Sequence, residues 1–436
     1  MARIGLIAVS GVRIVNERLV RHGVTLPGFV ERAEVIASMP SLGLLTLAGC
    51  TPDHHAIEYL ERPEFDPAAL PDFDLVAISS FTAKSSVMYA IADHYRARGI
   101  AVVLGGLHVT LCPDEAAAHA DAIVVGDGEA AWPRLLADWE RGALTPRYTR
   151  STVGPAALGA ATPRYDLLDP ARYNRLPVQT TRGCPYACEF CAASRVLGPY
   201  RLKPVASVVR ELRAVKACWP RPFIELADDN TFVDKAHGRA LVRAIAAEDV
   251  RWFTETDVTV ADDPELLHLL ADSGCRQLLI GFESPSAEAL GRIGGAGFKH
   301  AWFDRYRPAI DAIQARGVSV IGCFIAGTDG DTPDVFEAIE RFVESSGLAD
   351  VQVTVLTPFP GTALHRRLAR EGRLLPNPGW ERCTLFDVAF VPRRMSVADL
   401  EAGLEHLMGV LYTEQARTRR RRGFVRAARE SRRAIA

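Results

Sequence analysis

The chain has 436 residues, of which 48% are hydrophobic, and this length and composition allow two or three domains with sizeable cores. Its 51 Lys and Arg residues nearly balance 53 Asp and Glu residues, so no overall positive field indicates a nucleic-acid partner. No apolar run approaches the roughly 20 residues that a transmembrane helix needs, and charged residues follow the first apolar run too soon for a signal peptide. Most cysteines stand singly, which favours a reducing cytoplasm as the location.

Residues 1–145 alternate short β-branched runs with amphipathic segments. The runs predict buried parallel strands and the segments between them predict helices. We therefore expect an α/β domain with an open, doubly wound, Rossmann-like sheet, which binds ligands at the carboxyl ends of its strands. The expected strands are Gly5–Ser10, Leu75–Ser79, Ala101–Leu104 and Ala122–Val125, and the expected helices are Ser85–Arg98 and Ala130–Arg141.

Glycines and small polar residues follow these expected strands. Paired glycines let the backbone lie against a flat ligand where a Cβ would clash, although glycines at strand ends also occur merely to make turns. The candidate ligand residues at this edge are Ser79, Gly105, Gly106, His108, Thr110, Gly126, Gly128 and Glu129. His54 and His55, which follow an earlier turn, are expected at the surface.

Residues 146–177 carry several prolines and few helical patterns, which predicts a linker packed across two domains. In residues 178–375 a strand followed by a helix recurs six times, which predicts a parallel sheet with right-handed crossovers. Six such units make a partial, TIM-like (β/α)6 barrel that is open on one side and has its active site at the carboxyl edge. Its expected strands are Val178–Thr181, Phe223–Leu226, Arg251–Thr256, Gln277–Phe282, Ser319–Ile325 and Val351–Leu356.

The only dense cysteine group follows the first of these strands. Cys184, Cys188 and Cys191 fall within one short loop, and three thiolates can hold three irons of a 4Fe–4S cluster while the fourth iron stays open to a small ligand. Phe190 would shield such a cluster from water. A structural zinc site usually takes four protein ligands, and a disulfide would leave one thiol over; zinc or an inert group of thiols is the alternative.

Carboxylates and glycines collect at the same carboxyl edge after later strands. They suit a ligand with a cationic ammonium and a ribose diol, because both groups donate hydrogen bonds. Helix capping is the alternative for each acidic residue, and we assign it to Asp334 and Ser207. The candidate ligand residues are Ala227, Asp228, Asp229, Glu255, Glu283, Gly327 and Asp331.

The C-x3-C-x2-C spacing with Phe190 before the last cysteine resembles the signature of the radical S-adenosylmethionine (SAM) enzymes, and residues 178–375 are similar to that family nearly throughout. The resemblance implies a 4Fe–4S cluster that binds SAM and cleaves it reductively to a 5′-deoxyadenosyl radical. It implies residues 227–229 near the methionyl amino group, with Glu283 and residues 327–331 near ribose and adenine. It also implies a small-molecule substrate and an electron donor such as flavodoxin or ferredoxin.

Residues 1–145 resemble the cobalamin-binding domain that precedes the barrel in a large subgroup of these enzymes, through the glycine turns named above. The D-x-H-x-x-G segment that gives cobalt a histidine in many such domains is missing, because residues 9–14 read VSGVRI, and His94 stands at the wrong offset within an expected helix. Either cobalt is bound without a histidine or the domain has lost the cofactor. With cobalamin the implied reaction is C-methylation. A cyclisation, rearrangement or oxidation without methyl transfer is the alternative, and a non-catalytic scaffold is a third hypothesis.

Residues 376–436 form a smaller helical extension that would cover the open side of the barrel. Trp380 and Tyr412 are expected in core packing, and Cys383 as a hydrogen donor is the less favoured alternative to an inert thiol. Nine arginines crowd residues 417–436 against the single acid Glu430. We expect a solvated helix end there, with contact to an anionic surface as the alternative.

Overall fold

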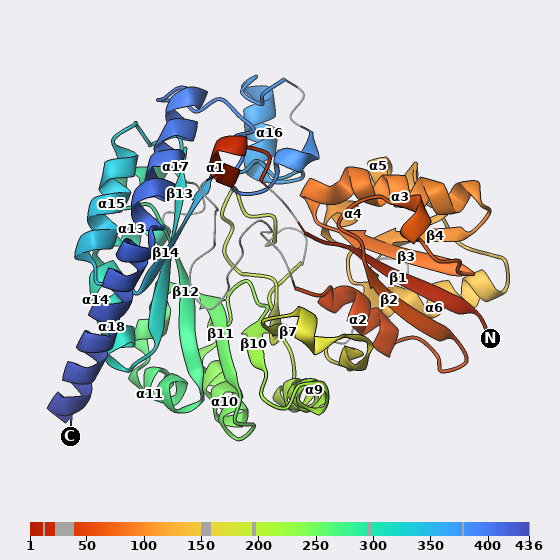
Figure 1. Cartoon of the computed structure of the whole chain (residues 1–436), viewed down its shortest axis with the longest axis horizontal. Helices are drawn as coiled ribbons and strands as arrows, with labels where there is room; N and C mark the ends of the chain where they lie inside the picture. Colours follow the sequence, from red (N-terminus) through yellow and green to blue (C-terminus); the bar gives the residue numbers. More distant parts are fainter. Residues whose placement is uncertain are drawn as a thin grey trace.

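Two parallel six-stranded sheets, each covered by helices, organise the chain (Figure 1). The computed structural model describes residues 1–11, 14–21, 39–149, 158–193, 198–293, 298–376 and 379–435. A doubly wound sheet precedes a barrel-like one, and helices follow at the C-terminal end. The predicted α/β fold class is therefore confirmed.

The first sheet has the strand order β2-β1-β3-β4-β5-β6. The chain turns to one side of β1 to form β2 and then to the other side to form β3, and the carboxyl end of such a switch point is where doubly wound sheets bind ligands. The strands are β1 (Arg3–Val9), β2 (Ala56–Glu61), β3 (Leu75–Ser80), β4 (Ala101–Gly105), β5 (Ala122–Val125) and β6 (Arg147–Thr149). The edge strands β2 and β6 were not predicted from the sequence. Strand β2 is half-buried throughout and so lacks a buried apolar run, and β6 has only three residues.

Helices cover both faces of this sheet, because alternate strand residues point to opposite sides. Ile7 and Val9 of β1 pack in one core with α3 (Ser85–Ala97), α4 (Leu107–Leu111) and α5 (Pro113–Ala117). Leu6 and Ala8 pack in the other core with α2 (Leu42–Gly49) and α6 (Gly128–Glu140).

The second sheet has the strand order β14-β13-β12-β11-β10-β7, so successive strands are neighbours and the series is open between β7 and β14. This arrangement confirms the partial six-unit barrel. The strands are β7 (Leu176–Val178), β10 (Phe223–Leu226), β11 (Arg251–Thr256), β12 (Cys275–Glu283), β13 (Ser319–Ala326) and β14 (Asp350–Val355). The helices that follow them are α9 (Val205–Cys218), α10 (Lys235–Ala246), α11 (Pro264–Asp272), α12 (Ala287–Arg292), α13 (Phe298–Ala301), α14 (Tyr306–Ala315), α15 (Val335–Ser345) and α16 (Ala363–Arg370).

Short elements join the two sheets and frame the cysteine loop. Between β6 and β7 lie two 3-10 turns, Tyr165–Leu167 and Pro170–Arg172, whereas residues 150–157 of the expected linker lie outside the described residues. Tyr173 donates a hydrogen bond to Glu61 of β2 (2.7 Å), so this connection contacts the first domain. The antiparallel pair β8 (Thr181–Arg182) and β9 (Arg201–Leu202) closes the base of the cysteine loop.

The C-terminal extension is helical, with α17 (Val397–Leu411) packed on α15 and β14, and α18 (Glu414–Ile435) packed on α14 (Figure 1). The expectation of a solvated arginine-rich end holds for only part of α18, because Arg420 is buried and pairs with Asp350 (3.4 Å). Arg421, Arg422 and Arg426 are exposed. Every helix in the described part of the chain is too short or too polar to cross a membrane.

A segment of the first domain reaches over to the second. Residues 14–21, with α1 (Glu17–Arg21), lie beside α17 rather than on the first sheet (Figure 1). The Asp387 carboxylate accepts hydrogen bonds from the backbone N–H groups of Val15 (2.9 Å) and Asn16 (2.7 Å), and Leu19 is buried in the barrel core. The two domains are therefore joined at this point as well as through the linker.

Candidate active site

A cavity of about 460 Å³ lies between the two domains. One wall is formed by the carboxyl ends of β1, β3, β4 and β5, and the facing wall by residues of the barrel's carboxyl edge. Barrel residues on that wall include Gln179, Arg182, Ala227 and Asp229. The cavity thus joins the ligand-binding edges of both sheets.

An arm of this cavity enters the first domain between its sheet and two helices. Val103 and Val124 line it from the sheet, and Leu47 of α2 and Trp132 of α6 line it from the helices. Protein interiors are normally close-packed, so apolar space of this kind indicates a bound molecule. The lining combines the glycine turns at the strand ends with apolar side chains of the sheet, α2 and α6.

Two glycine turns form the floor of the cavity at the strand ends. Gly106 has φ 98° and ψ −167°, a backbone conformation that is essentially restricted to glycine, and a Cβ there would lie 2.3 Å from Ser79 Oγ. Thr110 Oγ1 donates to the Gly106 carbonyl (2.8 Å) and accepts from the Gly126 N–H (3.0 Å), which ties the two turns together. Seven of the first-domain residues singled out from the sequence line this cavity: Ser79, Gly105, Gly106, Thr110, Gly126, Gly128 and Glu129.

His108, which was expected among the ligand residues, does not line the cavity. It is fully buried beneath α4, where its Nε2 lies 3.0 Å from the Tyr89 hydroxyl and 3.5 Å from Glu115. Burial lowers the pKa of His108 and favours the neutral imidazole. The side chain points into the domain because position 108 is the second residue of a helix whose outer face is occupied by Leu107.

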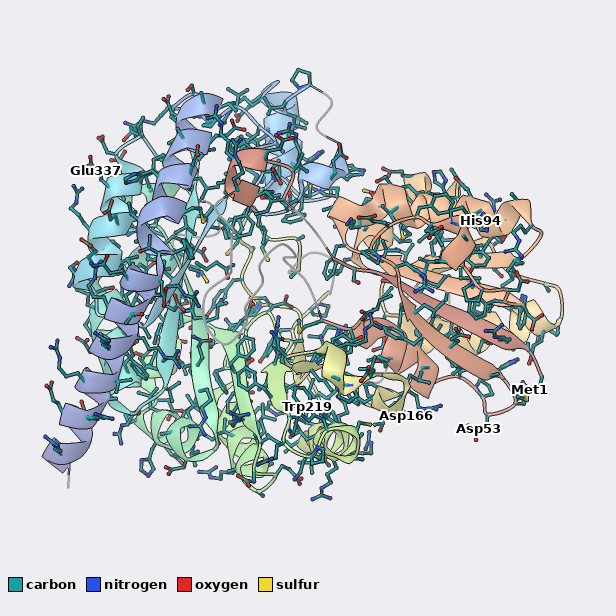
Figure 2. The ribbon with its side chains drawn as sticks, viewed as in Figure 1. Met1, Asp53, His94, Asp166, Trp219 and Glu337 are labelled. Atoms are coloured by element: carbon teal, nitrogen blue, oxygen red, sulfur yellow. The ribbon has the colours of Figure 1, made fainter. Side chains whose placement is uncertain are left out.

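The other early histidines lie away from the cavity as well. His54 is exposed as expected, but His55 is buried, 3.0 Å from Glu140, which corrects its expected surface position. His94 belongs to α3 and lies on the side of the first domain remote from the barrel (Figure 2). None of these histidines lines the cavity.

Glu129 lines the cavity but is engaged in ion pairs that join the domains. Arg182 of the barrel binds Glu129 (2.7 Å) and Asp127 (2.9 Å), and Arg201 binds Asp127 (2.8 Å). Burial alone would raise the pKa of Asp127, but the two arginines lower it below its usual range. Glu129 thus serves the domain interface, a role that its position after a strand could not reveal.

The three loop cysteines are half-buried thiols at the carboxyl edge of the barrel, and none of them forms a disulfide. Burial raises the pKa of Cys184, and burial raises the pKa of Cys188 to about 12, with Glu283 and the neighbouring thiols adding to the effect. Iron coordination would displace these protons, so the donor set fits a cluster. Gly183 (φ 81°) keeps the loop tight, since a Cβ there would lie 2.7 Å from the Gly198 carbonyl oxygen. Phe190 packs against the barrel core.

Asp228, an expected ligand residue, is engaged in hydrogen bonds at the start of the cysteine loop. Its carboxylate accepts from the backbone N–H groups of Thr180 (2.7 Å) and Thr181 (2.9 Å) and from the Thr231 hydroxyl (2.9 Å). These bonds tie the start of the cysteine loop to the end of β10. Asp228 is buried and does not line the cavity, whereas the neighbouring Asp229 does.

Asp229 faces the cysteine loop with an unusual proton affinity. Burial and the Asp228 charge raise its pKa from 3.8 to about 6, while the Gly183 N–H opposes the shift. Such a carboxyl group is ready to ionise when a cation arrives. Asp229 is therefore the carboxylate best suited to an ammonium group beside the cluster.

Glu283 and Lys299 form a buried pair near Cys188. Glu283 has φ 67°, which is strained for a residue with a side chain, and its Oε1 lies 3.0 Å from Lys299 Nζ. Lys299 Nζ also donates to the Gly281 carbonyl (2.7 Å), and its charge lowers the pKa of Cys188. The sequence analysis missed Lys299, because it stands in the short helix α13 with no strand end or motif to mark it.

The remaining predicted residues lie further along the barrel. Asp331 Oδ2 accepts from the N–H groups of Gly327 (3.0 Å) and Thr328 (2.8 Å), while Asp331 Oδ1 and Thr328 Oγ1 are buried without a hydrogen-bond partner in the described part of the chain. Burial raises the pKa of Asp331 to about 6. Glu255 lies on β11, and its charge contributes to raising the pKa of Cys323 after burial.

The two capping assignments are corrected in part. Asp334 stands at the N-cap of α15, but its side chain makes no capping hydrogen bond. Ser207 lies inside α9 and is buried, so it is not a cap.

Three family models match successive parts of the chain. Residues 32–136 match the B12 binding domain, residues 178–343 match the radical SAM superfamily, and residues 362–435 match a domain of unknown function, DUF4070. The bacteriochlorophyllide d C-8(2)-methyltransferase of Chlorobaculum tepidum is 30% identical over 78% of each chain. This chain belongs to the radical SAM superfamily. Within it, the chain is a member of the branch that has an N-terminal B12-binding domain.

Further relatives of this radical SAM enzyme support the same placement. The hopanoid C-2 methylase of Rhodopseudomonas palustris is 27% identical over 78% of this chain and 66% of that protein. The solved structure of the methyltransferase TsrM from Kitasatospora setae with cobalamin and a [4Fe–4S] cluster has the same fold, with a TM-score of 0.69 over 100% of both chains at 18% identity. The enzyme is thus a cobalamin-dependent radical SAM methyltransferase that uses a 4Fe–4S cluster, SAM and cobalamin.

Proposed function

We propose that this enzyme transfers a methyl group to an unactivated carbon of an apolar, ring-containing small molecule held in the cavity between its two domains. The observation that carries the proposal is the cavity itself, whose walls are the glycine turns of the B12-binding domain and the carboxyl edge of the barrel. When bound, the cluster with SAM supplies a 5′-deoxyadenosyl radical, and cobalamin supplies the methyl group. The protein orients these groups and excludes water.

The barrel residues are arranged to recognise SAM. We assign the amino group of SAM to Asp229 and its carboxylate to Lys299, because these are the opposite charges that lie near the cysteine loop. Glu283 keeps Lys299 in place through their ion pair (3.0 Å). The unpartnered oxygens of Thr328 and Asp331 are suited to hydrogen-bond donors of the adenine or ribose.

The first domain is arranged to hold cobalamin without a protein imidazole below the cobalt. The described residues that line the cavity include no histidine, and His108 points away from it. The apolar arm between the sheet and helices α2 and α6 offers space for the nucleotide substituent of the cofactor. Between the two alternatives that the missing histidine leaves open, this geometry favours binding over loss.

We infer the substrate class from the names of the relatives. The two methylases described above are named for a bacteriochlorophyllide and for hopanoids, which are multi-ring molecules. The reductive step also requires a low-potential electron donor, for which flavodoxin or ferredoxin is the natural candidate. The methyltransferase relatives that match most of this chain support methyl transfer over a radical reaction without it.

Anaerobic incubation of the cluster-loaded and cobalamin-loaded enzyme with SAM, a reductant and tetrapyrrole or polycyclic lipid substrates tests this function. Mass spectrometry should find a product heavier than the substrate by one methylene unit, together with 5′-deoxyadenosine. Formation of 5′-deoxyadenosine with a product that lacks this mass gain would support the alternative reaction.

A further inference from the structure

We propose that an arginine patch beside the cysteine loop is the docking surface for an acidic protein that carries single electrons. The proposal rests on the proposed function, because only a reductive reaction needs such a partner. We define the α16 patch by its six arginines: Arg366, Arg367, Arg370, Arg373, Arg393 and Arg394. In the step proposed, the reduced carrier loses one electron and the oxidised cluster gains it.

The α16 patch is bonded directly to the cysteine loop. Glu189 stands between Cys188 and Cys191, and Arg367 binds its two oxygens through Nη2 (2.7 Å) and Nε (3.2 Å). The Leu364 N–H at the start of α16 also donates to the Glu189 carbonyl (2.9 Å). Glu189 alone therefore separates Cys188 from a partly exposed arginine, which gives an electron a short path from the surface.

The patch keeps an excess of positive charge. Its inner arginines, Arg367 and Arg373, both pair with Asp329 (2.6 and 2.9 Å), and Glu371 pairs with them at the rim. Glu288 pairs with Arg394 (3.6 Å), so four carboxylates, Glu189, Asp329, Glu371 and Glu288, stand against six arginines. An acidic partner would be attracted to this excess, and long-range attraction of this kind raises association rates.

The outer arginines are exposed to a partner, although Arg393 pairs with Glu371 (3.4 Å) and Arg394 pairs with Glu288 (3.6 Å). Arg366 and Arg370 are exposed on α16, where Arg366 donates to the Gly361 carbonyl (2.6 Å) and Arg370 donates to the Arg366 carbonyl (3.4 Å). Arg393 and Arg394 are 53% and 42% exposed. A recess of about 290 Å³ between Glu189, Arg367 and Arg393 gives the surface a concave centre.

The exposed arginines of α18 offer a second positive surface but lack the connection to the cluster. Helix α18 packs on α14 and β14, at the side of the barrel (Figure 1). Arg421 and Arg422 are exposed there and serve as a control of equal charge. We therefore place the electron-carrying protein at the α16 patch and not at α18.

The test compares the double variant Arg366→Glu/Arg370→Glu with the control Arg421→Glu/Arg422→Glu, both loaded with cluster and cobalamin. Two rates of 5′-deoxyadenosine formation are measured at low ionic strength, one with reduced flavodoxin and one with titanium(III) citrate. Binding of oxidised flavodoxin is measured separately by flavin fluorescence polarisation, which does not depend on turnover.

We expect the α16 variant to lose roughly tenfold in both flavodoxin binding and flavodoxin-driven rate, and the loss to shrink at high salt. Its rate with titanium(III) citrate should equal that of the wild type, and the α18 variant should behave as wild type throughout. Wild-type flavodoxin affinity in the α16 variant, or an equal loss in the α18 variant, would overturn the proposal. If the rate with titanium(III) citrate also falls in the α16 variant, its affinity for oxidised flavodoxin decides whether the α16 patch is the docking surface. Absence of a methylated product would count against the proposed function alone, because 5′-deoxyadenosine and binding report docking without it.

Discussion

Individual carboxylates of the site divide into those that hold the backbone or the domain interface and those that remain available to a ligand. Asp228 is saturated by hydrogen bonds from residues 180, 181 and 231, and Glu129 is paired with Arg182. Asp331 is buried and Asp229 is half-buried, and the pKa of each is raised. The sequence could place all four after strands, but it could not reveal which partner each would find, because the partners come from distant segments.

The raised pKa of Asp229 predicts a pH dependence of SAM binding. Above about pH 6 its carboxyl group is ionised and attracts the SAM ammonium; below about pH 6 it is neutral and affinity should fall by up to about tenfold per pH unit. Binding titrations of the cluster-loaded protein between about pH 5 and about pH 8 should show this fall. Asp229→Asn should bind weakly with a flat profile. Asp331→Asn is the control, since Asp331 also titrates near 6, and a flat profile in that variant would contradict the assignment.

The cysteine loop predicts a second outcome at this scale. Cys188→Ala should abolish the brown cluster absorbance, the bound iron and 5′-deoxyadenosine formation, because two thiolates cannot retain the cluster. Circular dichroism should be unchanged, since Glu189 still binds α16. Cys218→Ala removes a half-buried thiol of α9 and should keep the cluster. A Cys188→Ala protein that still cleaves SAM would refute the cluster assignment.

At the scale of elements, the turns at the strand ends determine what can bind. The strands themselves were largely predictable, because parallel buried strands form short β-branched runs; Phe223–Leu226, Arg251–Thr256 and Ala122–Val125 have the predicted bounds. The direction in which side chains point within the following turns could not be predicted from the sequence. His108 follows the glycine pair in sequence yet turns inward, because α4 begins immediately after Gly106.

The glycine turn predicts a selective loss of cobalamin. Gly106→Ala should cost about 1–3 kcal/mol of backbone strain and drive its Cβ against Ser79 Oγ, closing the cavity floor. Cobalamin binding, followed by absorbance after gel filtration, should be lost while the iron content stays normal. Gly99→Ala is the matched control, because Gly99 also has positive φ (74°) but open space around its Cβ position. If Gly106→Ala and Gly99→Ala retained equal amounts of cobalamin, the turn at Gly106 would not be part of the cobalamin site.

At the scale of the whole molecule, the two domains act together because charged contacts cross the cavity between them. Arg182 binds Asp127 and Glu129, and Asp387 binds residues 15 and 16 of the N-terminal segment. Composition and periodicity predicted both sheets and their order along the chain. They could not predict that residues 14–21 would pack on the barrel, since α1 is short and only Leu19 of it is buried.

The ion pairs of Arg182 with Asp127 and Glu129 join the two domains, and we expect weaker cobalamin binding when Arg182 is replaced. Arg182→Met removes the arginine partner of Glu129 and one of the two arginines that bind Asp127, and losing charged hydrogen bonds worth about 2 kcal/mol corresponds to roughly thirtyfold in cobalamin affinity. Equilibrium titration with hydroxocobalamin measures the change. Arg141→Met is the control, because its pair with Asp138 (2.5 Å) lies within the first domain. If Arg182→Met bound hydroxocobalamin with wild-type affinity, the ion pairs of Arg182 would not contribute to cobalamin binding.

The central claim is that the cluster and cobalamin act on one substrate across the cavity between the domains. The most direct test is an anaerobic reaction of the fully loaded enzyme with SAM that carries a trideuterated methyl group, analysed by mass spectrometry with tetrapyrrole and polycyclic lipid substrates. We expect a product that contains one trideuteromethyl group and that appears, together with 5′-deoxyadenosine, only when cobalamin is bound. A product without the label, formed equally well by enzyme lacking cobalamin, would contradict it.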